Sequence, residues 1–176
     1  SASEGAGRPL ASAHAASHVR HPTHFVRSTS VPKASSARSV AVAAASAPLA
    51  NAPGGAVYVF KDGASGWAEI AKLTALDGAA GDHFGSGLAL SGSRLLIGAE
   101  GDASGAGSAY VFERNGGGDW PEAEKLVASD AAVQDNFGRA VAIDGDRIGV
   151  GAGVGDGLAL DSGSTYIYVR NATGEW

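Results

Sequence analysis

The chain has 176 residues, a formal net charge of -5 and no cysteine. Disulfides, thiol nucleophiles and thiolate metal sites are therefore excluded. No apolar run reaches the ~20 residues that a membrane-spanning helix needs, so we expect no transmembrane segment.

The charges divide the chain at about residue 53. Residues 1–53 carry five basic side chains and one acidic one, whereas residues 54–176 carry eight basic and seventeen acidic ones. The first segment is rich in Ala, Ser, His and Arg, and it lacks the periodicity that would bury one face. It is therefore predicted as a low-complexity arm that is extended, disordered or similar to a transit peptide. An arm docked on the folded part is the alternative, in which residues 39–47 supply one strand.

From residue 54 onward the sequence predicts short strands separated by glycine-rich turns. Asp-Gly and Asn-Gly pairs between alternating apolar runs are typical of tight hairpins, because both residue types tolerate positive φ. Nine strands are expected, as the last two of one sheet, four of the next and three of a third. The runs that indicate them are 56–60, 67–75, 87–90, 94–98, 108–113, 120–128, 139–143, 147–151 and 164–169.

These elements repeat along the chain with a period of 52 to 56 residues. A unit of this length with four short strands is typical of a β-propeller blade, which buries its faces against neighbouring blades. The predicted fold is therefore all-β, with four-stranded antiparallel blades forming a partial propeller of about two blades over residues 54–176. The aromatic repeat positions are Tyr58, Tyr110 and Tyr166, and Trp67, Trp120 and Trp176.

Two further short motifs recur in both units. Phe84-Gly85 is followed by Gly98-Ala99, and Phe137-Gly138 is followed by Gly151-Ala152. With these motifs the chain resembles the FG-GAP repeat family, whose repeats build the propeller of integrin α subunits. The resemblance implies a structural role for the signature residues and a non-catalytic module outside the cell or on its surface. Because a closed ring needs at least four blades, further blades or neighbouring chains are expected to complete the stack.

The resemblance also implies a calcium loop between the two motifs. Here only residues 91–94 or 144–147 connect them. Calcium needs about six to eight oxygen ligands, which four residues do not provide, so no cofactor is expected there. Asp102, Asp156 and Asp161 lie on loops that differ between the units and are weak candidates for contact with a partner or cation, against a solvated glycine-rich loop. Asp82 and Asp135 recur before Phe-Gly and are predicted to bond turn amides.

The sequence contains no nucleophile elbow and no phosphate-binding loop, so no catalytic residues and no enzyme activity are predicted. The acidic folded part does not favour nucleic acid. The predicted function is a protein-interaction or adhesion module that contacts other proteins or surface glycans. The alternative is a structural accessory subunit of a larger complex, such as one in an organelle, docked through the arm and the blades.

Overall fold

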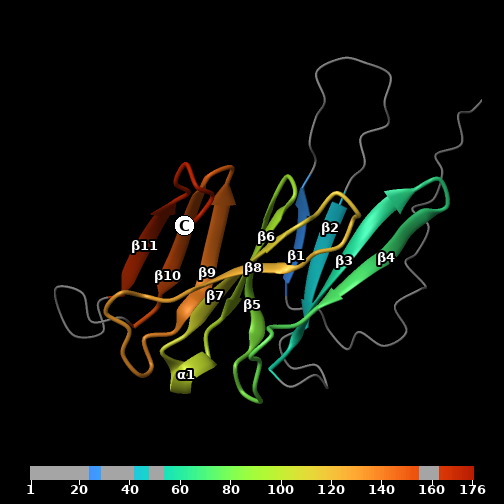
Figure 1. Ribbon diagram of the computed structural model, residues 1–176. Helices are drawn as coiled ribbons and strands as arrows, with labels where there is room; N and C mark the ends of the chain where they lie inside the picture. Colours follow the sequence, from blue (N-terminus) through green and yellow to red (C-terminus); the bar gives the residue numbers. More distant parts are fainter. Residues whose placement is uncertain (1–23, 29–41, 48–53, 155–162) are drawn as a thin grey trace, which may run out of the picture.

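The computed structural model describes residues 24–28, 42–47, 54–154 and 163–176. Within these ranges the chain forms eleven strands in three antiparallel sheets, and one short helical turn (Figure 1). This arrangement confirms the predicted all-β fold with four-stranded antiparallel sheets.

The first sheet, sheet A, consists of β1 (His24–Ser28), β2 (Val42–Ala47), β3 (Ala56–Gly63) and β4 (Gly66–Leu73), paired in that order. Strands β1 and β2 lie within the predicted arm, and β2 falls in the segment that the docked-arm alternative named. The nine strands expected from residue 54 onward are confirmed as β3 to β11, and β1 and β2 are two further strands within the arm. The sequence signal was weak because β2 contains only Val, Ala and Ser, and its place depends on backbone pairing with β3.

The second and third sheets follow the same meander. Sheet B consists of β5 (Phe84–Ser91), β6 (Arg94–Ala99), β7 (Ser108–Glu113) and β8 (Glu122–Leu126), with the helical turn α1 (Asp102–Gly105) between β6 and β7. Sheet C consists of β9 (Phe137–Asp144), β10 (Arg147–Ala152) and β11 (Ser164–Val169). Each connection is short, so consecutive strands pair with each other.

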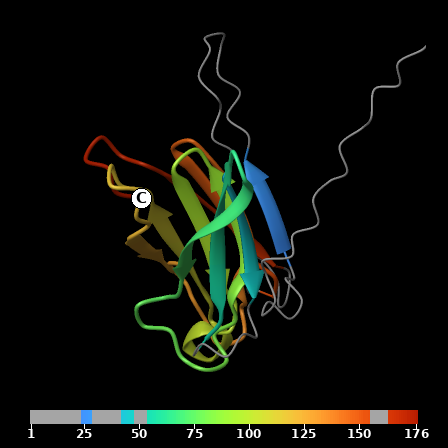
Figure 2. The ribbon, with the colours of Figure 1, turned by 90° about the vertical axis from the view of Figure 1, so that its right-hand side faces the viewer.

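The three sheets stand face to face like neighbouring blades. Figures 1 and 2 show sheet B between sheets A and C, and Figure 2 looks along this stack from the side of sheet A. One buried cluster joins A to B and includes Val57, Leu73 and Phe84. A second joins B to C and includes Val111 and Phe137. Only sheet B is therefore covered on both faces by described residues.

This position explains why the strands differ in sequence. Leu95, Leu96 and Ile97 are consecutive and fully buried in β6, because alternate side chains face sheets A and C. In β11, by contrast, Ile167 is 68% exposed and Tyr168 packs toward sheet B. The uninterrupted apolar run marks the central sheet, and the alternating run marks a sheet covered on one side.

Each Phe-Gly motif begins a sheet and joins it to the preceding sheet. Phe84 forms a parallel bridge with Gly55, and its amide donates to the Gly54 carbonyl at 2.5 Å. Phe137 forms the equivalent bridge with Gly107, and its amide donates to the Ala106 carbonyl at 3.0 Å. We call the receiving backbone the Phe-Gly seat. The phenylalanine ring fills the space between the two sheets. The backbone bridge beside it requires the two backbones to approach each other closely.

Candidate functional site

The connections β4–β5 (74–83), β6–β7 (100–107) and β8–β9 (127–136) emerge at one end of the stack, which we call the α1 end (Figure 1, lower edge). The short β5–β6 and β9–β10 hairpin turns lie at the opposite end. Longer connections give more room for side chains that are not committed to the core. Binding residues tend to lie on loops that a rigid scaffold positions, so the α1 end is the candidate binding site.

Two buried aspartates fix the loops that precede each Phe-Gly motif. The Asp82 carboxylate accepts a hydrogen bond from the Ala79 amide at 2.6 Å, and the Asp135 carboxylate accepts one from the Ala132 amide at 2.7 Å. Both side chains are buried. This is the turn-amide role that their recurrence predicts, and it leaves these two loops in the same conformation.

A second set of polar contacts, the Lys125 network, joins two loops to two strands at the α1 end. Lys125 Nζ lies 2.5 Å from Asp77 Oδ2 and 2.6 Å from Asp102 Oδ2. Tyr110 donates its hydroxyl to Asp77 at 2.9 Å, and Ser108 donates to Asp102 at 2.5 Å. The ammonium group also lies 5.2 Å from the centre of the Tyr110 ring. The network therefore binds the β4–β5 and β6–β7 loops to β7 and β8.

The network keeps its groups charged at neutral pH. The bond from Lys125 holds the pKa of Asp77 below its usual range. Burial raises the pKa of Asp102, but the bonds from Lys125 and Ser108 outweigh it, and the net shift is downward. Burial lowers the pKa of Lys125, but its bonds to Asp102 and Asp77 dominate and raise it. None of these groups is poised to exchange a proton near pH 7. The network therefore has the properties of a structural clamp.

Replacing Lys125 by methionine is expected to lower the free energy of unfolding by ~1–3 kcal/mol, because two carboxylates lose a charged partner. The lowered carboxyl pKa values stabilise the fold above the usual aspartate pKa of ~3.9, and this contribution is lost as the pH falls through the folded values. The raised Lys125 pKa stabilises the fold below ~10.4 and is lost at still higher pH. The difference between native and variant protein should therefore be largest between about pH 5 and 9 and shrink in acid.

Urea unfolding at a series of pH values measures this difference. Lys72→Met is the matched control, since Lys72 holds the same repeat position in sheet A and lies 5.8 Å from the Tyr58 ring centre. In the described part of the chain it contacts no carboxylate. The role of the Lys125 network as a structural clamp would be contradicted if both variants lowered the free energy of unfolding equally. It would also be contradicted if the difference between native and Lys125→Met protein did not depend on pH.

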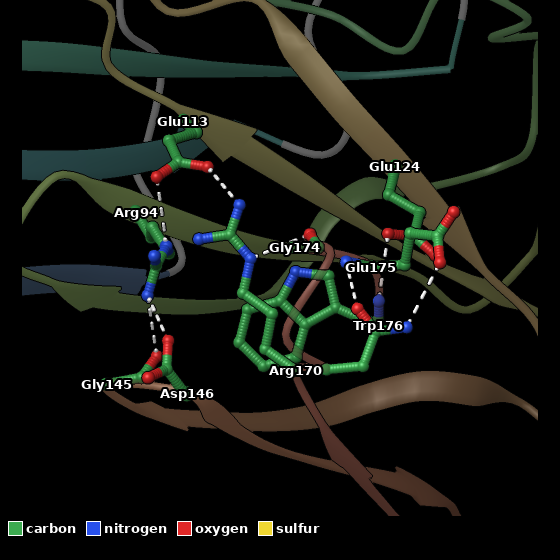
Figure 3. Close-up of polar contacts among 10 residues, drawn as sticks. Arg94, Glu113, Glu124, Gly145, Asp146, Arg170, Gly174, Glu175 and Trp176 are labelled. Atoms are coloured by element: carbon green, nitrogen blue, oxygen red, sulfur yellow. Dashed lines mark hydrogen bonds and ion pairs between the residues drawn. The ribbon is translucent and has the colours of Figure 1, made fainter.

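The opposite end contains a comparable set of contacts between sheets B and C (Figure 3). Glu113 accepts from Arg94 at 3.2 Å and from Arg170 at 3.1 Å. Arg94 also contacts Asp146 in the β9–β10 turn at 3.0 Å. Both guanidinium groups lie within 6 Å of the Trp176 ring centre, at 5.8 and 5.9 Å. Arg94 and Asp146 are therefore occupied by the contact between the sheets, at the position where the family resemblance implied a calcium loop.

The FG-GAP repeat model matches residues 67–112 and 120–168, which together exceed half of the chain. The chain belongs to the FG-GAP repeat family. No curated protein matches the chain at the significance applied. FG-GAP repeats are non-catalytic blades of β-propellers, in agreement with the three stacked sheets.

The FG-GAP units are out of phase with the sheets. The first unit begins in β4 of sheet A and ends in β7 of sheet B, and the second runs from β8 of sheet B to β11 of sheet C. Each unit therefore contributes strands to two sheets. Neighbouring blades are therefore held together both by the continuous chain of each unit and by the contacts at the Phe-Gly seats.

The structure places the FG-GAP signature residues between the sheets and at the ends of their strands. Phe84 packs edge-to-face on Tyr110 at 5.5 Å between ring centres, and Phe137 packs on Tyr166 at 5.3 Å. Gly85 and Gly138 have φ of 100° and 92°, which glycine adopts without strain. The buried members are Phe84, Gly85, Gly98, Ala99, Tyr110, Trp120, Phe137, Gly138 and Ala152, whereas Tyr58, Gly151 and Tyr166 are partly exposed and Trp67 is exposed.

The three aspartates proposed as weak candidates have different outcomes. Asp102 is one of the carboxylates of the Lys125 network, so its charge is balanced inside the chain. Asp156 and Asp161 lie outside the described residues. Among the described residues no group of three or more His, Asp or Glu side chains could hold a metal ion. In that same part of the chain no helix is long and apolar enough to cross a membrane.

Apolar side chains are exposed on two loops of the α1 end. Leu76 of the β4–β5 loop is 87% exposed, and Val127 and Val133 of the β8–β9 loop are 52% and 67% exposed. Sequence reasoning missed them because they are not repeated between the units. Their exposure on loops fixed by buried aspartates and by the Lys125 network makes them the candidate contact residues. We call these three side chains the apolar loop group.

Proposed function

We propose that this FG-GAP chain is a non-catalytic interaction and adhesion module that contacts other proteins or surface glycans outside the cell. The observation that carries the proposal is the apolar loop group. Contact between exposed aliphatic side chains and water is unfavourable, so binding of a partner that covers these side chains is favoured. The loops that hold them do not need to become ordered on binding, because buried hydrogen bonds already fix their conformation.

The charges around the apolar loop group favour a partner of complementary character. Asp130 is exposed and accepts a hydrogen bond from the Tyr166 hydroxyl, which leaves its negative charge in place, whereas the charge of Asp77 is balanced by Lys125. Carboxylates at the rim of an apolar contact favour basic or hydroxyl-rich partners and contribute mostly to orientation and association rate. A protein surface with Lys or Arg around an apolar centre would match both features, as would a neutral glycan with an apolar sugar face.

The proposal is tested by binding the purified chain to arrays of extracellular proteins and of glycans. We expect saturable binding to a protein or glycan, and a loss of about tenfold or more in affinity when Leu76, Val127 and Val133 are all changed to serine. Ile70→Ser is the matched control, because Ile70 is an exposed aliphatic residue on β4, away from these loops. Circular dichroism and thermal unfolding establish that each variant is folded. Absence of saturable binding on both arrays, or equal binding by the triple variant, would contradict the proposal.

A further inference from the structure

One short motif in the turn after β11 belongs neither to the apolar loop group nor to the buried clusters. Asn171 is followed by Ala172 and Thr173, which is the Asn-X-Ser/Thr acceptor sequence for N-linked glycans. The other asparagines are followed two residues later by proline or glycine, and they are Asn51, Asn115 and Asn136. The acceptor sequence therefore occurs once in the chain.

The structure places this motif on an exposed tight turn. The side chains of Asn171, Ala172 and Thr173 are all exposed. Two backbone bonds close the turn: the Asn171 amide donates to the Glu175 carbonyl at 2.8 Å, and the Gly174 amide donates to the Asn171 carbonyl at 3.1 Å. The acceptor sequence is therefore presented at the surface in a defined conformation.

The Asn171 side chain is bound to the turn mainly through its oxygen. Oδ1 accepts from the Thr173 and Glu175 amides, both at 3.0 Å, and the Thr173 hydroxyl lies 2.6 Å from it. Nδ2 donates to Glu175 Oε2 at 3.0 Å, and bonds from Asn171 and Thr173 hold the pKa of Glu175 below its usual range. The amide nitrogen carries two hydrogens, and this bond uses one of them. Substitution of the other hydrogen is therefore compatible with the turn.

The turn between β7 and β8 is a natural comparison, because it has the same length and the same bonds. The Asn115 amide donates to the Asp119 carbonyl, and the Asp119 amide donates to Asn115 Oδ1, both at 2.9 Å. Asn115 Nδ2 donates to Asp119 Oδ2 at 3.3 Å. Gly117 takes the place of Thr173. The turn therefore forms without the hydroxyl, and closure of the turn does not explain Thr173.

We propose that Asn171 is an N-glycosylation site. The donor is an oligosaccharide carried on a lipid pyrophosphate, and a transferase of the secretory pathway catalyses the step. A bond forms between Asn171 Nδ2 and the anomeric carbon of the first sugar, while the bond from that carbon to a phosphate oxygen breaks. The pyrophosphate leaves with the electron pair, and one amide proton passes to a base of the transferase. The inference rests on the extracellular location in the proposed function.

A glycan at Asn171 lies away from the apolar loop group. The Arg170 amide donates to the Asp146 carbonyl of the β9–β10 turn at 3.0 Å, and that turn lies at the end opposite the α1 end. Arg170 Nε also donates to the Gly174 carbonyl at 2.7 Å, which attaches the glycosylated turn to this end (Figure 3). A bulky, hydrated glycan there obstructs close contact at one end of the stack and leaves the α1 end open to a partner.

The site is tested by secreting the 176-residue chain from cultured animal cells behind a cleavable signal peptide. Peptide mass spectrometry measures the occupancy of Asn171, and we expect roughly half or more of the secreted chains to carry a glycan that peptide N-glycosidase removes. Thr173→Ala should lower this occupancy at least about tenfold, whereas Thr173→Ser should retain it, because the acceptor sequence needs a hydroxyl. An unmodified Asn171 in the secreted native chain would overturn the proposal, as would equal occupancy in Thr173→Ala.

Gly117→Thr is the matched gain-of-site variant, since it creates the same acceptor sequence at Asn115. A side chain added at Gly117 would meet only the ends of the exposed Asn115 and Asp119 side chains, at 3.3 and 3.4 Å. We expect this variant to carry a second glycan, at Asn115. If Asn115 were modified in the variant while Asn171 stayed unmodified, the cells would be competent and the proposal would be wrong.

Failure of this proposal is distinguishable from failure of the proposed function. The added signal peptide brings the chain into the secretory pathway whatever its natural location, so an unmodified Asn171 contradicts the glycosylation site alone. Absence of saturable binding on the protein and glycan arrays by fully glycosylated chain contradicts the proposed function alone. Where binding is found, enzymatic removal of the glycan should change the affinity by less than about twofold, because the apolar loop group lies at the other end.

Discussion

Gly98→Ala is expected to lower the free energy of unfolding by about 3 kcal/mol or more. The added carbon would overlap the carbonyl group of Gly138, and neither partner is a flexible side chain. The two backbones must therefore separate, which weakens the Phe-Gly seat and the cluster of buried side chains between sheets B and C. The difference in strand propensity between glycine and alanine changes the free energy of unfolding far less than this displacement does.

Gly151→Ala is the matched comparison for this prediction. It adds the same methyl group at the same repeat position, where the nearest atom is the Ala140 side chain at 3.4 Å. Its effect should lie within about 0.5 kcal/mol of zero, as for most exposed positions. Urea unfolding followed by tryptophan fluorescence gives both values. A similar cost for the two variants would show that glycine is needed at this position for a reason within its own strand.

Phe137→Ala is expected to cost about 3–5 kcal/mol, the usual range for removal of a buried phenylalanine ring. The ring is fully buried and packs on Tyr166 at 5.3 Å and on Tyr168 at 6.4 Å between ring centres. Because it lies in the cluster that joins sheet C to sheet B, the loss should fall mainly on sheet C. Phe137→Leu, which retains much of the buried volume, should lose considerably less.

Hydrogen exchange measures where the stability is lost. In Phe137→Ala the amides of β9, β10 and β11 should exchange faster, while those of β3 and β6 stay protected by the cluster between sheets A and B. Phe84→Ala should reverse this distribution, since Phe84 lies in that first cluster. Uniform loss of protection in both variants would show that the three sheets unfold as one unit and that the two clusters are not independent.

The repeated positions made sheets B and C predictable from the sequence. Phe-Gly, Gly-Ala and the alternating strands recur because every blade solves the same packing problem at each face. Strands β1 and β2 were not predicted as a pair, since His24–Ser28 and Val42–Ala47 carry neither the motifs nor a regular apolar alternation. Their identity as strands depends on backbone hydrogen bonds to each other and to β3, which local sequence does not encode.

The polar contacts at the two ends were only partly predictable. The recurrence of Asp82 and Asp135 indicated their bonds to turn amides, because such bonds are local. Asp77 and Lys125 are 48 residues apart, and the recurrence of Lys125 did not show which carboxylates would surround it. Arg94 likewise recurs as Arg147, but only Arg94 has the turn of another sheet beside it. Long-range pairs of this kind depend on how the blades stack.

The phase difference between the FG-GAP units and the sheets bears on how such a chain can lengthen during evolution. A tandem duplication of one unit adds one closing strand for the older blade and the opening strands of a new one. Every junction between copies then lies inside a hydrogen-bonded sheet. Strands from two successive copies pair within that sheet, so each new copy is joined to its neighbour by backbone hydrogen bonds. When the chain lengthens by whole units, the first and last sheets of the stack keep the same strand composition, whatever the number of copies.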